Sequence, residues 1–188
     1  MPTIVVALAV AIMIGLGLWQ LLDRLPRKEA FLAQLAANPA KPVIAFPSTA
    51  DDRLLFRRTA GDCRPPVAIR LAGAGASGFR AIATCTAGMT VQLGTTHDPN
   101  ARPAWGGGPV TGSISHAPSS QSLIGAALHP EPQRLMLVAA PPLAGLQPNP
   151  PATIDSVPNN HLAYAGQWFF FAAIATVIYV LAVVRRRV

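Results

Sequence analysis

Charged side chains are scarce in this chain of 188 residues, at 12% of the sequence. Soluble domains usually carry about 25%, so this deficit excludes a chain that is exposed to water along its whole length. Three of the charges behind the net +7 are Arg185, Arg186 and Arg187, close to the C-terminus. The other charges are scattered, which argues against a phosphate-binding patch and against nucleic acid as a partner.

The signatures of common active sites are also missing. The sequence has no G-x-S-x-G, Walker loop or H-E-x-x-H motif, and its carboxylates are few and isolated, so a paired acid–base site is excluded. Residues 73–78 match G-x-G-x-x-G, but a strand-like segment follows where a dinucleotide site needs a helix. We interpret these glycines as a turn, and we expect a protein that is not an enzyme.

Cysteine occurs only at Cys63 and Cys85. The chain has no C-x-x-C-H motif for covalent haem attachment, and the two cysteines are not closely paired as a zinc or copper site would require. Two interpretations stay open. The cysteines form a disulfide between neighbouring strands in an oxidising compartment, or they are separate thiols.

Two long apolar segments are the main feature of the sequence. Residues 4–22 carry no charge and would extend about 28 Å as a helix, which matches one hydrocarbon core. No Lys or Arg precedes this segment and no small-x-small cleavage site follows it, so we expect an uncleaved anchor rather than a signal peptide. Residues 163–184 form the second segment, with aromatic residues before it and arginines after it, as in a spanning helix.

These segments predict a membrane protein with transmembrane helices at residues 1–22 and 163–184. The arginines in the tail at 185–188 place the C-terminus in the cytoplasm, whereas Arg24, Arg27 and Lys28 favour the opposite orientation. Because long loops are often translocated despite such charges, we follow the second helix. Both termini are then expected in the cytoplasm, and residues 23–162 are expected in the periplasm or an equivalent compartment.

The domain at residues 23–162 is predicted to be small, antiparallel and β-rich, either a barrel or a sandwich. A short helix at 25–37 is expected to precede it. The predicted strands are brief apolar runs bounded by Gly, Pro, Ser or Asp, at 54–59, 66–71, 79–84, 89–93, 110–114 and 135–139. The stretches at 94–108 and 115–133 are expected loops, and the proline-rich stretch at 141–158 predicts an extended connector to the second helix.

A histidine, His161, lies at the start of the second apolar segment, where Asn159 or Asn160 can cap the helix. On a helix, His161, Tyr164 and Trp168 share one face. This arrangement has two interpretations. The imidazole is an axial ligand of haem iron with the aromatic rings beside the porphyrin, or it is an interfacial histidine in an ordinary aromatic belt.

Both ends of the sequence resemble the Surfeit locus protein one family of assembly factors for haem-copper cytochrome c oxidase. Residues 16–20 with Arg24 and Lys28 are similar to the family's G-x-W-Q-x-x-x-R-x-x-x-K signature. Residues 158–169 are similar to its P-N-N-H-L-x-Y-A-x-x-W-F block. The intervening domain matches weakly in residues, and Leu93 stands where the family commonly has the Arg of an Arg-Gly pair.

The resemblance implies an assembly factor of the bacterial inner membrane, with both termini in the cytoplasm and the β-rich domain in the periplasm. It implies that haem a is held transiently, with its iron on His161, and is passed to cytochrome c oxidase subunit I. The haem a synthesis machinery is a further candidate partner, beside the lipid bilayer. The supporting candidates for haem binding are Tyr164, Trp168, Trp19, Gln20 and Arg24.

Alternatives remain for these assignments. Trp19 is by default an anchor in the aromatic belt, and Gln20, Arg24 and Lys28 either contact haem propionates or the partner subunit or are interfacial residues. The alternative function is a cofactor-free membrane scaffold for subunit I, whose helices would pack on partner helices through small residues.

Overall fold

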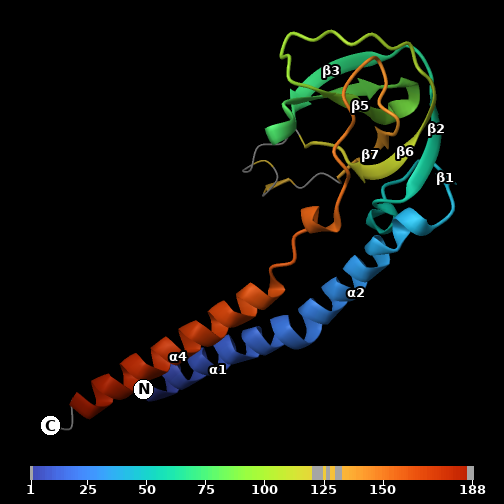
Figure 1. Cartoon of the computed structure of the whole chain (residues 1–188). Helices are drawn as coiled ribbons and strands as arrows, with labels where there is room; N and C mark the ends of the chain where they lie inside the picture. The colour runs from blue at the N-terminus through green and yellow to red at the C-terminus, as the bar shows by residue number, and fades with distance from the viewer. Residues whose placement is uncertain (1, 120–124, 126–127, 130–132, 186–188) are drawn as a thin grey trace. The chain divides into compact units, whose positions relative to one another are not determined.

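The computed structural model describes residues 2–119, 125, 128–129 and 133–185 (Figure 1). The chain forms two compact units, Met1–Ala33 with Val157–Val188 and Gln34–Ser156. The predicted tail at 185–188 therefore lies outside the described residues except for Arg185, and the predicted loop at 115–133 is described only in part.

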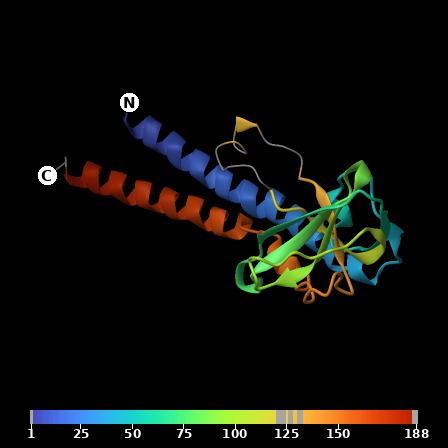
Figure 2. The same cartoon turned by 90° about the horizontal axis from the view of Figure 1, so that it is seen from above.

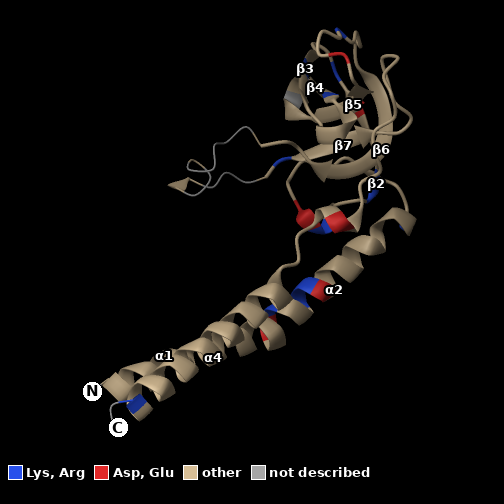
Figure 3. Ribbon diagram, turned by 60° about the vertical axis from the view of Figure 1, so that its left-hand side comes forward, with Lys and Arg blue, Asp and Glu red and all other residues tan. Residues whose placement is uncertain are grey.

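The first unit contains two apolar helices, α1 (Pro2–Trp19) and α4 (His161–Arg185), which lie side by side (Figures 1 and 2). Lys, Arg, Asp and Glu are missing from both helices except at Arg185 (Figure 3). Both helices are long and apolar enough to cross a membrane, judged by length and composition. The first residues of α1 and the last residues of α4 lie at the same end of this helix pair (Figure 1).

Small residues allow α1 and α4 to approach closely. Gly17 is buried, and a Cβ atom added to it would lie only 2.7 Å from the ring of Phe169. Ala165 and Ala172 are the buried residues of α4. Because spans in lipid associate through close packing rather than through the hydrophobic effect, this glycine and these alanines suit a paired transmembrane hairpin.

The helix continues beyond Trp19 through a π-helical turn, η1 (Gln20–Arg24), into α2 (Leu25–Ala36). The N–H of Leu25 donates to the carbonyl oxygen of Gln20, five residues earlier. Pro26 follows directly, and it has no N–H and crowds the carbonyl group four residues before it. The wider turn accommodates this proline, so the predicted helix at 25–37 is present but is continuous with α1.

The second unit is built on a mixed sheet. The seven described strands form one sheet in the order β1-β2-β6-β7-β5-β4-β3, rather than the two sheets of a sandwich. Their bounds are Ile44–Ala45 (β1), Arg58–Cys63 (β2), Ala68–Gly73 (β3), Phe79–Thr84 (β4), Thr90–Thr96 (β5), Gly108–His116 (β6) and Leu135–Ala139 (β7).

The prediction of an antiparallel sheet is wrong, because β1 pairs with β2 and β7 pairs with β5 in parallel. Strand β7 lies between β5 and β6 and is antiparallel to β6. Strands β5 and β6 run in opposite directions, so any strand inserted between them must be parallel to one of the two. The insertion of β7 therefore accounts for the parallel pair β5–β7, and the short strand β1 adds the second parallel pair at the edge of the sheet.

Most predicted strands are present. The runs at 79–84 and 135–139 are confirmed as β4 and β7 with the same bounds, and those at 66–71, 89–93 and 110–114 overlap β3, β5 and β6. The glycines of residues 73–78 form the predicted turn, in which the N–H of Ala74 donates to the carbonyl oxygen of Gly78. The match to a dinucleotide motif therefore has no structural counterpart, since β4 follows where a helix is required.

The predicted strand at 54–59 is wrong in its position. Asp52–Leu54 is a 3-10 turn, and the carboxylate of Asp51 accepts a hydrogen bond from the N–H of Arg53 at its start. The Arg53 guanidinium also donates to this carboxylate and holds the pKa of Asp51 below its ordinary value. The strand begins only at Arg58, after this capped turn. Strand β1 was not predicted because two residues leave no periodicity to detect.

The predicted connector at 141–158 contains no helix or strand longer than a single turn or bridge, with a turn at 143–146 and a 3-10 turn at Ile154–Ser156. Its first part folds against β5. The N–H of Leu143 donates to the carbonyl oxygen of Leu93, and Gln147 forms a bridge with Thr95. The connector thus belongs partly to the sheet unit rather than only spanning a gap.

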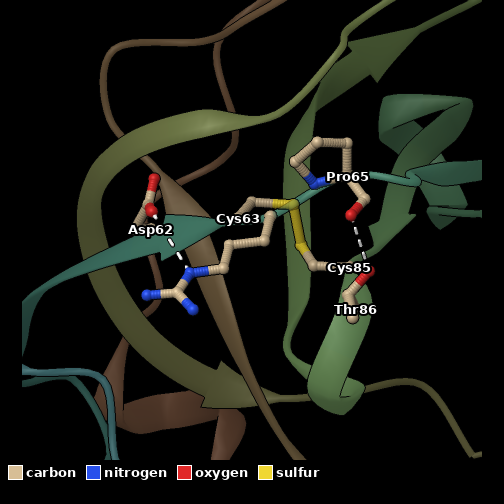
Figure 4. Close-up of a disulfide and its surroundings, with 6 residues drawn as sticks. Asp62, Cys63, Pro65, Cys85 and Thr86 are labelled. Atoms are coloured by element: carbon tan, nitrogen blue, oxygen red, sulfur yellow. Dashed lines mark hydrogen bonds and ion pairs between the residues drawn. A yellow bond between two sulfur atoms is a disulfide. The ribbon is translucent and has the colours of Figure 1, made fainter.

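A disulfide lies within the main buried cluster of the sheet unit. Cys63, at the end of β2, is bonded to Cys85, directly after β4, and the two residues are 1% and 4% exposed (Figure 4). Three strands, β6, β7 and β5, separate β2 from β4 in the sheet order. The sheet must therefore curl to bring these ends together.

The disulfide is formed, and the interpretation as separate thiols is wrong. The main cluster of buried residues consists of Cys63, Ala81, Ala83, Cys85, Val91, Leu93, Val110, Leu137 and Ala139.

Replacing both cysteines with alanine is expected to lower the free energy of unfolding of the sheet unit by about 3 kcal/mol, because the disulfide closes a loop with a sequence separation of 22. The measurement is the urea dependence of amide hydrogen exchange in peptides from β2 and β4 of the full chain. Reductant should shift the wild type to the midpoint of the double variant and leave the variant unchanged. A variant with the wild-type midpoint would contradict the closing role of this disulfide.

Candidate functional site

The first residue of α4 meets the π-helical turn that follows α1. Nδ1 of His161 lies 2.8 Å from Oε1 of Gln20, and both side chains are partly buried. The two residues are 141 positions apart in the sequence. This hydrogen bond brings together two of the predicted site residues from opposite ends of the chain.

The hydrogen bond fixes where the imidazole carries its proton. The amide oxygen of Gln20 can only accept, so Nδ1 of His161 carries the proton and donates it. A neutral imidazole protonated at Nδ1 has its lone pair at Nε2. His161 therefore presents a ligand nitrogen, while Gln20 sets the tautomer and restrains the ring, as the partners of metal-bound histidines commonly do.

Local sequence explains why His161 begins the helix. Asn160 precedes it at the N-cap position, and its carbonyl oxygen accepts the N–H of Tyr164. Pro158 lies two residues earlier, before the helix begins. The side-chain oxygen of Asn159 is buried and has no hydrogen-bond partner in the part of the chain that the structure describes. A buried acceptor without a donor is costly.

Trp19 and Arg24 form a second contact at the same turn. The Arg24 guanidinium carbon lies 4.6 Å from the centre of the Trp19 ring, which is a cation–π distance. Both residues are exposed. This stacking holds a cation and an aromatic surface together beside the glutamine that contacts His161.

The two aromatic residues of α4 are placed near His161 only by helical spacing. Tyr164 is 50% exposed and Trp168 is partly buried. Among the described residues, neither forms a hydrogen bond or ring contact with His161 or Gln20. Their faces remain available to a bound molecule, and their predicted roles stay predictions.

Sequence reasoning missed Gly17 and Phe169 as part of this arrangement. The close approach of Gly17 to the Phe169 ring holds α1 and α4 together. This contact lies nearer the start of α1 than the hydrogen bond between Gln20 and His161 does. Gly17 lies three residues before Gln20, and Phe169 lies eight residues after His161, so each pair shares a helix face. A signal was present, since both residues belong to the two terminal blocks of the resemblance.

Of the predicted site residues, His161 alone has a side chain of a type that commonly binds transition metals. Within residues 2–119, 125, 128–129 and 133–185, no three His, Cys, Asp or Glu side chains come together as a metal centre. One imidazole does not hold a free transition-metal ion in the way that three or four ligands do. His161 is therefore suited to a metal that brings most of its own ligands, as haem iron does.

A model of the SURF1 family matches residues 7–173, a range that contains most of α1, the sheet unit and the first half of α4. No curated protein and no solved structure matches the chain.

Replacing Gln20 with leucine is expected to free the His161 ring, because the acceptor that fixes the proton on Nδ1 is removed. The ring nitrogens should then report a mixture of the two tautomers in ¹⁵N spectra of protein labelled at histidine. Tyr164→Phe serves as the control, since it keeps the Gln20 acceptor and should leave the spectrum unchanged. Identical ring shifts in Gln20→Leu and the wild type would show that the hydrogen bond does not set the tautomer.

Proposed function

The chain belongs to the SURF1 family, a family of assembly factors associated with cytochrome oxidase assembly, and we propose that it binds haem a and aids its insertion into oxidase subunit I. One observation carries this proposal. The hydrogen bond between Nδ1 of His161 and Oε1 of Gln20 leaves the lone pair of Nε2 free for an axial position on iron.

Gln20 would act on the iron ligand without touching the metal. A hydrogen-bonded partner at Nδ1 orients the ring and raises the basicity of the other nitrogen. Haem would supply an iron that accepts an electron pair and four ring nitrogens that complete most of its coordination. The protein then needs to provide little beyond one well-oriented imidazole, and the candidate site provides this.

The side chains around His161 fit the rest of a porphyrin. Tyr164 and Trp19 offer exposed aromatic surface, and Trp168 lies one turn further along α4. The Arg24 guanidinium is able to pair with a propionate carboxylate while it stays stacked on Trp19. These features support the fit to a flat, apolar and anionic group.

A single protein ligand also suits transfer of the cargo. A carrier must release haem to its acceptor, and dissociation from one imidazole breaks only one coordinate bond. A site with two axial protein ligands would hold the iron more firmly. The occurrence of one imidazole in the candidate site therefore supports delivery rather than permanent use of the haem.

We place the chain in the bacterial inner membrane with both termini in the cytoplasm and the sheet unit in the periplasm. The two apolar helices support a hairpin through the bilayer, and Arg185 lies at the end of α4 opposite His161. The positive-inside tendency then favours His161 at the outer interface. The disulfide between Cys63 and Cys85 supports an oxidising compartment for the sheet unit.

The test of the proposal is the haem content of the full chain purified from cells that make haem a. His161→Ala should reduce haem to the background level, because the axial ligand is removed. Gln20→Leu should lower haem affinity by about 10- to 100-fold, which is the usual cost of losing the partner of a metal-bound histidine. His97→Ala is the matched control, since His97 is an exposed histidine of the sheet unit, and it should leave the haem content unchanged.

Visible absorption spectra and the pyridine haemochrome provide the measurement. Equal haem content in the wild type and His161→Ala would refute the role of His161 as the ligand. A wild type that is free of haem but co-purifies with subunit I would refute haem binding and favour the cofactor-free scaffold.

A further inference from the structure

Strand β2 is fully paired on one side and only partly paired on the other. Strand β6 pairs with β2 along its whole length, Arg58–Cys63. On the opposite side, β1 pairs only with Thr59 and Ala60, and the N–H of Phe46 then donates to the carbonyl oxygen of Ala60. Among the described strands, none continues this pairing beside residues 61–63.

The backbone of Asp62 faces this open edge. In a strand, the polar groups of alternate residues point to the same side. Because the carbonyl oxygen of Ala60 points toward β1, the N–H and carbonyl group of Asp62 point the same way. Asp62 lies opposite Pro109 in β6, and a residue without an N–H fits a position at which no hydrogen bonds are exchanged. Neither group has a hydrogen-bond partner among the described residues, so a donor and an acceptor lie unused at the edge of the sheet.

A cavity of about 600 Å³ lies along the same edge. The end of β2, the segment that follows β1 and the start of β7 all contribute to its wall. Phe46 and Met89 supply apolar surface, and a Cβ atom added to Gly61 would lie 2.6 Å from the terminal methyl group of Met89. The glycine thus lets the Met89 side chain lie directly on the strand backbone within the cavity wall.

The charged side chains of the cavity are mainly cationic. Arg64 and Arg134 line it, and Asp62 is the single acidic residue among the lining residues that the structure describes. The Arg64 guanidinium lies 3.8 Å from the Asp62 carboxylate, and the two side chains are 81% and 61% exposed. So exposed and distant a pair is weak, and Arg64 is free to pair with another carboxylate.

We propose that this cavity binds an extended, acidic segment of a partner polypeptide, which adds a strand beside β2 and places a carboxylate near Arg64 and Arg134. Strand addition supplies backbone hydrogen bonds, and the flanking cavity receives side chains. A small anion would pair with the arginines but would leave the strand edge unpaired. An apolar ligand would contact Phe46 and Met89 but would leave the arginines unpaired. The site lies wholly in the sheet unit and is independent of haem binding at His161.

The probe is an acetylated, fluorescein-labelled heptapeptide of alternating threonine and valine with a central glutamate, titrated with the full chain in detergent. Fluorescence anisotropy should show saturable binding, and a peptide with lysine at its centre should bind about tenfold more weakly. Arg134→Glu should weaken binding of the glutamate peptide by about tenfold or more. The matched control is Arg70→Glu, because Arg70 is exposed on β3 at the opposite edge of the sheet.

A second pair of variants tests the strand edge itself. Asp62→Pro removes the backbone donor, whereas Asp62→Ala removes the same carboxylate and keeps the N–H. The proline variant should bind the glutamate peptide about tenfold more weakly than the alanine variant, because the proline variant cannot donate a backbone hydrogen bond to the peptide. Hydrogen exchange in β6 provides the check that the sheet of the proline variant is intact.

Three results would overturn the proposal. The first is no saturable binding up to about 1 mM peptide, the weak end of specific recognition. The second is equal affinity for the glutamate and lysine peptides. The third is equal affinity of Asp62→Pro and Asp62→Ala, which would show that no strand is added even if Arg134→Glu lowers the affinity.

Discussion

The candidate site depends on one hydrogen bond, from Nδ1 of His161 to Oε1 of Gln20. It assigns the proton of the imidazole, leaves the lone pair at Nε2 and restrains the ring. Two other features of the helix unit allow Gln20 and His161 to come within hydrogen-bond distance. Gly17 allows α1 to approach the Phe169 ring, and the π-helical turn before Pro26 holds Gln20 in its place at the end of α1. An ordinary aromatic belt would need none of these features, since a tryptophan or tyrosine at an interface requires no fixed partner on another helix.

The two units are stabilised by different means. The helices pack through a glycine and alanines, as suits a pair of spans in lipid. The core of the sheet unit contains several small residues, among them Ala81, Ala83 and Ala139. Alanine buries little apolar area, and the hydrophobic contribution to stability scales with the area buried. The disulfide compensates for this small core by restricting the unfolded chain.

The sequence predicted the elements that depend on local pattern and missed those that depend on tertiary contact. Charge-free runs identified α1 and α4, and strands β4 and β7 have the predicted bounds. The insertion of β7 between β5 and β6 is invisible in strand patterns, so the parallel pairing was missed. Helical periodicity predicted which residues share a face of α4 with His161. It could not predict which residue of another helix lies against that face. The contact with Gln20 follows from the packing of α1 on α4.

The open edge of β2 has a rival explanation, because proteins commonly protect edge strands with charges and short neighbouring strands. Asp62, Arg64 and the two-residue strand β1 fit that description. Protection alone, however, requires that the edge be covered or made unattractive to other strands. It does not require a cavity beside the exposed backbone, and it does not favour Phe46 and Met89 in the wall of that cavity. Apolar surface next to an unpaired backbone promotes the pairing that protection prevents. The combination is therefore better explained by a surface that accepts one selected strand, with the arginines determining which charge that strand carries.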